Sequence, residues 1–131
     1  MKFRKKKKRI AVGATPGIKF MAQIVKGETI DFKKMAEMMD KASTVNKGDI
    51  LAVLDLMAAT ATWMLEEGHP VKFDGFGTFT PKAKVKAVDT IEEVTAQTVE
   101  SVGVRYTPDV DVKAKMKSVS IHIEDTEESA N

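Results

Sequence analysis

The sequence has no cysteine, which excludes disulfide bonds, thiolate nucleophiles and cysteine-ligated zinc sites. It has only two histidines, His69 and His122, and no potential metal ligand lies at a suitable spacing from either, so both are interpreted as surface or strand-edge residues. It also lacks a G-x-S-x-G elbow, and Gly75-Phe76-Gly77 is not a phosphate-binding loop because Thr80 stands where the third glycine belongs. We therefore expect a protein that is not an enzyme and that uses no cofactor and no metal.

Aromatic residues make up only 6% of the chain, and we find no uninterrupted apolar run near the ~20 residues that a membrane-spanning helix needs. A basic start followed by Ile10 to Ala14 imitates a secretory signal, but Pro16, Gly17 and Lys19 interrupt it at once. With 43% hydrophobic and 31% charged residues, the composition indicates a small soluble globular protein. We expect a cytoplasmic location and no membrane partner.

The charge is distributed unevenly, although the net charge is only +2. Residues 1–9 hold seven cations and no acid, whereas the rest of the chain has a net charge of −5. Four acids gather near the other end, at Glu124, Asp125, Glu127 and Glu128. The basic head could neutralise phosphates in a sequence-independent, salt-sensitive way, or it could be a solubilising or RNA-associating arm.

The hydrophobic periodicity predicts a strand over residues 18–25, a helix over 31–42 capped by Asp31, and a longer helix from Asn46 to about Glu67. The apolar stripe of the longer helix is wide enough to need partners on two sides. Trp63, in the same helix, is interpreted as buried packing rather than as a stacking platform.

From Val71 the period changes to two, which predicts a hairpin turning at Gly75 to Gly77 and a second arm that carries Lys82, Lys84 and Lys86 on one face. The pattern does not decide the structure of residues 89–101. A strand around residues 102–106, a short helix and a last strand over 119–123 follow. We predict an α+β fold with a basic head and turn (1–17), one domain (18–123) and an acidic disordered tail (124–131).

The stretch from Asn46 to Phe79 resembles the histone-like HU/IHF family of bacterial DNA-bending proteins. The resemblance rests on the capped entry Asn46-Lys47-Gly48-Asp49, the long helix ending at Gly68, and Val71-Lys72-Phe73-Asp74-Gly75-Phe76-Gly77-Thr78-Phe79. Tyr106-Thr107-Pro108-Asp109 fits the aromatic residue that leads into the family's terminal helix. The extra strand in front, residues 92–102 and the added last strand resemble the variant branch called HU-HIG.

This resemblance implies a homodimer in which two chains interlock through the long helix and the sheet. The candidate interface residues are Val53, Leu54, Met57, Ala61, Phe76 and Phe79. The family grips DNA with two β arms whose tips carry a proline wedge, but here the arm (80–105) has a net charge of zero and its only proline is Pro81 at the base. We therefore expect little bending of DNA.

The resulting hypothesis is a histone-like, nucleoid-associated protein that binds duplex DNA without sequence preference, mainly through phosphates. The candidate DNA-binding residues are Lys2, Arg4, Lys5, Lys6, Lys7, Lys8, Arg9, Lys82, Lys84, Lys86, Arg105 and Lys113. The alternative is a dimeric scaffold of the same fold that has lost DNA binding and recruits a protein, and RNA stays open as a partner.

Overall fold

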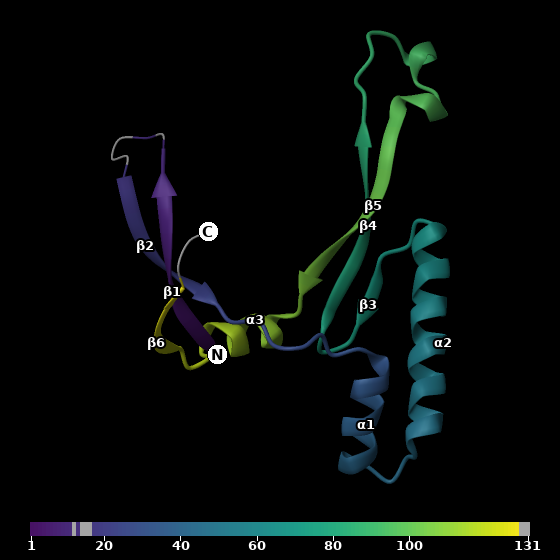
Figure 1. The fold of residues 1–131 in the computed structure, drawn as a ribbon. Helices are drawn as coiled ribbons and strands as arrows, with labels where there is room; N and C mark the ends of the chain where they lie inside the picture. Colours follow the sequence, from purple (N-terminus) through teal and green to yellow (C-terminus); the bar gives the residue numbers. More distant parts are fainter. Residues whose placement is uncertain (12, 14–16, 129–131) are drawn as a thin grey trace. The chain divides into compact units, whose positions relative to one another are not determined.

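The computed structural model describes residues 1–11, 13 and 17–128 and shows a mixed α+β fold (Figure 1). It contains two compact units. One comprises residues 1–29 and 116–131, and the other comprises residues 30–115. This division differs from the expected single domain over residues 18–123 with a head and a tail outside it, so we describe each unit by itself.

The unit of residues 30–115 begins with two helices. In α1 (Phe32–Ala42) the Asp31 carboxylate caps the first turn by accepting from the Lys34 amide at 2.9 Å. In α2 (Lys47–Glu66) the Asn46 side chain accepts from the Asp49 amide at the same distance. These caps satisfy backbone N–H groups that a helix start leaves without partners. Both predicted helices are confirmed.

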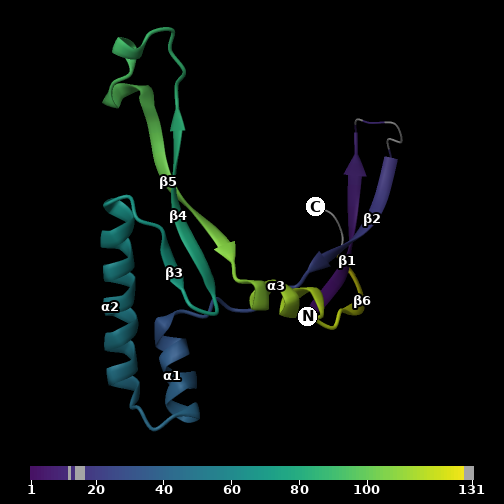
Figure 2. The ribbon, with the colours of Figure 1, turned by 180° about the vertical axis from the view of Figure 1, so that it is seen from behind.

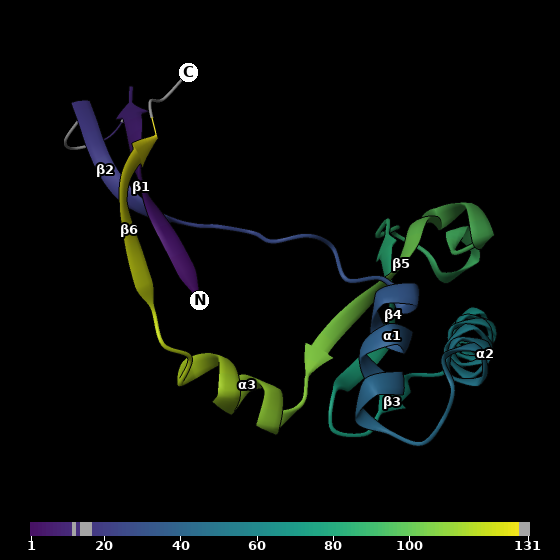
Figure 3. The same ribbon diagram turned by 60° about the horizontal axis from the view of Figure 1, so that its bottom comes forward.

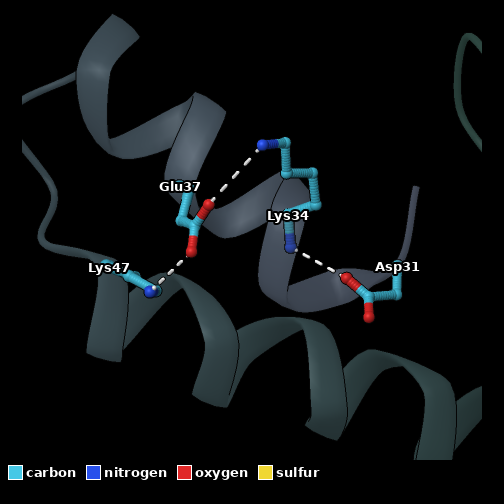
Figure 4. A network of polar contacts seen from close by, with 4 residues as sticks. All are labelled: Asp31, Lys34, Glu37 and Lys47. Carbon is cyan, nitrogen blue, oxygen red and sulfur yellow. Dashed lines mark hydrogen bonds and ion pairs between the residues drawn. The ribbon is translucent and has the colours of Figure 1, made fainter. Parts of the chain in front are cut away.

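An ion pair joins the two helices (Figure 4). Lys47 Nζ lies 3.0 Å from Glu37 Oε1, and Lys34 Nζ lies 4.0 Å from Glu37 Oε2. The hydrogen bond and the positive charge of Lys47 lower the pKa of Glu37 from its usual value of 4.5. The carboxylate therefore links the start of α2 to the middle of α1.

The sheet of this unit has the strand order β3-β4-β5 and is antiparallel. Strand β3 (Val71–Phe73) pairs only with the start of β4 (Gly77–Val85), whereas β4 pairs along its whole length with β5 (Val99–Pro108). Past the end of β3, β4 and β5 continue as a two-stranded ribbon (Figures 1 and 2). This ribbon is the arm that the sequence predicts.

The tip of the arm has a defined structure, which the sequence pattern does not decide. Two short 3-10 turns, Ile91–Glu93 and Ala96–Thr98, connect β4 to β5. Thr95 and Thr98 form a capping box at the second turn, and the Lys86 amide donates to the Thr98 carbonyl oxygen at 2.8 Å. The helix α3 (Val110–Lys117) follows β5, as predicted.

The unit of residues 1–29 and 116–131 contains a sheet with the order β2-β1-β6 (Figure 3). The central strand β1 (Lys2–Ile10) is antiparallel to β2 (Gly17–Ile24) and parallel to β6 (His122–Glu128). The basic head is therefore a central strand, and the acidic residues up to Glu128 are not a disordered tail but an edge strand. Residues 14–16 and 129–131 of the predicted turn and tail lie outside the described residues.

Little apolar surface is buried within one chain. Among the described residues only Ala36 of α1 and Ile50 of α2 are buried hydrophobic side chains. Trp63, expected to be buried, is 60% exposed, and Val53 and Leu56 on the same side of α2 are 63% and 67% exposed. The packing prediction for Trp63 is wrong for the single chain, because no other element of the described chain covers that side of the helix.

By length and composition alone, α2 would suffice to cross a membrane, contrary to our expectation from the sequence. A helix of a soluble protein that packs against partners on more than one side is as apolar as a membrane-spanning helix. Asp55 interrupts its apolar surface near the middle, and the helix is capped by side chains typical of water-soluble helices. We therefore treat the apolar character of α2 as a packing feature.

Candidate nucleic-acid interface

The seven candidate cations of the N-terminal segment lie on both faces of β1. Because side chains alternate along a strand, Lys2, Arg4, Lys6 and Lys8 share one face, and Lys5, Lys7 and Arg9 share the other. The expected basic head is therefore a strand that carries positive charge on both of its faces.

Acidic residues of β6 lie directly beside this strand. Lys2 Nζ is 3.7 Å from Glu124 Oε1, and Lys5 Nζ is 3.5 Å from Asp125 Oδ1. These ion pairs are exposed, so each contributes only about 0–1 kcal/mol. They nevertheless place negative charge directly beside Lys2 and Lys5, and the sequence alone does not show this because it depends on the pairing of β1 with β6.

Cations of the arm gather on one face of the ribbon. Thr80, Lys82 and Lys84 alternate along β4, and Arg105 faces Thr80 across the ladder, so Lys82, Lys84 and Arg105 share a face. Gly103 lies opposite Lys82, and a Cβ there would come 3.3 Å from Lys82 Cε. The long Lys82 side chain thus lies along the ribbon surface.

Two details separate this face from the one that the sequence predicts. The register shifts between Lys84 and Val85, so Lys86 lies beyond an irregularity and not in the same regular row. Lys84 Nζ also forms an ion pair with Glu100 at 3.5 Å. The regular basic face therefore consists of Lys82, Lys84 and Arg105, and Glu100 partly neutralises it.

The distal part of the arm has the opposite character. Residues 87–104 contain four acids and no lysine or arginine: Asp89, Glu92, Glu93 and Glu100. Ile91 is 81% exposed and Val94 is 62% exposed. The sequence predicts a neutral arm, and the structure divides it into a basic base and an acidic, partly apolar tip.

Lys113, the remaining candidate, is exposed on α3. Its amide donates to the Asp109 carbonyl oxygen at 3.0 Å, and Asp109 Oδ1 accepts from the Asp111 amide at the same distance. The Asp109 amide in turn donates to the Phe76 carbonyl oxygen. The start of α3 is thereby tied to the turn between β3 and β4.

An open apolar groove of about 610 Å³ lies between the helices and the sheet of this unit. Five of the six candidate interface residues line it, namely Leu54, Met57, Ala61, Phe76 and Phe79, whereas Val53 does not. The other lining residues are Phe32, Met35, Ala58, Thr62, Leu65 and Phe73. Our candidate set from the sequence misses all six of these residues, although the alternation of Phe73 with Lys72 is a usable signal for Phe73.

The family described as "HU domain fused to wHTH, Ig, or Glycine-rich motif" matches residues 2–123. The chain belongs to this HU-HIG family. Membership confirms the resemblance to HU and the HU-like α+β fold, and it places the chain in an architectural family rather than in an enzyme family.

A solved structure supports the fold. It is the crystal structure of a "putative bacterial DNA binding protein" from Bacteroides vulgatus, with a TM-score of 0.61 and 16% sequence identity. The similarity covers 97% of this chain but only 49% of that one, so this HU-HIG chain spans about half the length of the solved protein. No match was found among curated proteins.

Proposed function

We propose that this HU-HIG protein is a nucleoid-associated, cytoplasmic homodimer that binds duplex DNA without sequence preference, mainly through phosphates. The observation that carries the proposal is the row of Lys82, Lys84 and Arg105 on one face of the β4–β5 ribbon. Cations fixed along a rigid ribbon neutralise successive phosphates and release counterions, without reading base edges. The solved protein from Bacteroides vulgatus, named as DNA-binding, is consistent with this.

Dimerisation follows from the groove between the helices and the sheet. Its lining is almost entirely apolar, and burying one large apolar side chain stabilises by about 1.5–3 kcal/mol. A second copy supplies a matching occupant, because α2 presents further apolar residues such as Val53, Leu56 and Trp63 on its other side. Two chains that exchange these surfaces would give each the core that a single chain lacks.

Strong bending is not part of the proposal. The tip residues 87–104 contain no proline, and their four acids would repel the phosphates on either side of a base step. We therefore expect energy transfer between dyes at the ends of a short duplex to change little when the protein binds. A large change would argue that Ile91 or Val94 acts as a wedge.

The scaffold alternative is favoured by the same tip. The tip carries four acids and the apolar side chain of Ile91, which is 81% exposed. Such a surface suits a cationic protein better than it suits DNA, because the acids repel phosphates. In this alternative the fold and the dimer are kept and DNA binding is absent. The two functions are separated by whether a duplex binds at low salt.

A matched pair of variants tests the arm. Lys82→Gln, Lys84→Gln and Arg105→Gln together should reduce the slope of log affinity against log salt by about 0.9 for each phosphate that is no longer neutralised. A control that removes the same charge, Lys26→Gln with Lys33→Gln and Lys41→Gln, should change the slope much less. Equal effects of the two sets would show that net charge, and not the arm face, governs binding.

A further inference from the structure

One face of the β2-β1-β6 sheet combines apolar and basic side chains. Cross-strand partners share a face, and β1 pairs with β2 as Phe3 with Ile24, Lys5 with Ala22, Lys7 with Phe20, and Arg9 with Ile18. Ile123 of β6 pairs with Phe3 and joins the same face. One row of cations on β1 therefore lies next to a row of apolar residues on β2.

Phe20 is the prominent residue of this face. Its side chain is 65% exposed, and the neighbouring Ile18 is 53% exposed. Beside Phe20 the small side chain of Ala22 leaves an open hollow of about 390 Å³, lined also by Lys5, Met21 and Ile123. The aromatic ring thus borders a shallow hollow that Lys5 also lines. Lys7 lies directly across the ladder from Phe20.

An exposed aromatic ring beside a row of cations on a sheet matches the requirements of single-stranded nucleic acid. Unpaired bases stack on aromatic side chains, while cations follow the phosphates. Alternate residues on a strand are about 6.7 Å apart, a spacing close to that of successive phosphates on an extended single strand. We propose that this face binds single-stranded nucleic acid, with a base stacked on Phe20 and phosphates near Lys5 and Lys7.

Duplex DNA would not use Phe20 in this way, because the faces of its bases are stacked on one another. The inference therefore goes beyond phosphate-driven duplex binding and assigns this sheet a separate ligand. The ion pair between Lys5 and Asp125 opposes it only weakly. Both partners are exposed, with the Asp125 side chain fully so, and such a pair exchanges readily for a phosphate.

The test measures the anisotropy of dye-labelled oligothymidine, oligouridine and a hairpin duplex of equal charge, with the full chain. Phe20→Leu retains apolar bulk but removes the ring, and should weaken binding of the single strands about tenfold, the range expected for one stacked base. Phe20→Tyr should restore it. Ile18→Ala, which removes apolar area from the same face without removing a ring, should have a much smaller effect.

The hairpin duplex separates this inference from the proposed function. Its affinity should be the same for Phe20→Leu and the wild type, because phosphate contacts do not need the ring. Single-strand binding equal in Phe20→Leu and wild type would overturn the inference, as would no binding of either single strand at low salt. If single strands bind in a Phe20-dependent way and the duplex does not bind, the inference stands and the proposed function fails.

Discussion

Tyr106 packs so closely against Gly77 that a Cβ on Gly77 would lie 2.5 Å from Tyr106 Cε2. The same Cβ would lie 2.5 Å from the Thr107 carbonyl oxygen. The Tyr106 hydroxyl donates to the Phe76 carbonyl oxygen at 2.9 Å, and its ring lies 5.2 Å from the ring of Phe76 and 5.1 Å from that of Phe79. Gly77 therefore lets β4 and β5 approach closely at the base of the arm, next to the groove.

Gly77→Val should destabilise the fold more than Gly75→Val. Both glycines have positive φ, 156° and 78°, a conformation that costs a β-branched residue about 1–3 kcal/mol. Only Gly77 also meets backbone and a ring, whereas the space around Gly75 is open. Urea unfolding at one fixed protein concentration measures the difference. Equal midpoints for both variants and the wild type would show that the turn needs neither glycine.

Leu54→Asp should abolish the proposed dimer. Leu54 lines the apolar groove, and an unpaired charge buried there costs several kcal/mol, on the order of the 2–7 kcal/mol for burying an unpaired polar group. Leu54→Met, which conserves apolar volume, should leave association nearly unchanged. Sedimentation velocity at micromolar concentration measures both. A wild-type chain that sediments as a stable folded monomer would contradict the interlocked dimer.

Neutralising the acids of β6 should strengthen duplex binding. Glu124→Gln with Asp125→Asn removes the carboxylates beside Lys2 and Lys5, and the affinity at low salt should rise a few-fold, as expected from ion pairs of about 0–1 kcal/mol each. The matched control, Glu66→Gln with Glu67→Gln at the end of α2, removes the same charge from another site. Mobility shifts for both variants measure the effect. An equal rise in both would indicate net charge alone.

Lys47→Met should alter the pH dependence of stability through Glu37. Because Lys47 lowers the pKa of Glu37 below 4.5, the ionised carboxylate stabilises the fold above that pH. This stabilisation is lost as the pH falls through the lowered pKa. The variant should therefore be less stable than the wild type at pH 7, and the difference should shrink in acid. Urea unfolding at pH 7 and at pH 3 tests it, and a difference that does not depend on pH would contradict the role of Glu37.

The helices and part of the groove lining could be predicted from the sequence because their signals are local. Asp31 and Asn46 mark the two caps, and the spacing of Leu54, Met57 and Ala61 follows the helix period. The exposure of Trp63 could not be predicted from the same pattern. Periodicity indicates which side of a helix is apolar, but it does not show whether another element of the same chain packs against that side.

Strand β1 could not be predicted because residues 2–9 contain only one apolar side chain, Phe3, and hence no alternation of apolar and polar residues. One of its two partners is distant in sequence: β6 begins at His122. The pairing of basic β1 with acidic β6 depends on this long-range ladder. Because β1 is the central strand of its sheet, deleting residues 1–9 would disrupt that sheet, so substitutions are the better test of the basic head.

The most direct test of the central claim is a titration of the full chain against two duplexes of unlike sequence over a salt series. The account predicts equal affinities for both and a linear fall of log affinity with log salt, at about −0.9 for each phosphate contact. Absence of binding at low salt, or affinity that differs strongly between the two sequences, would contradict sequence-independent binding through phosphates.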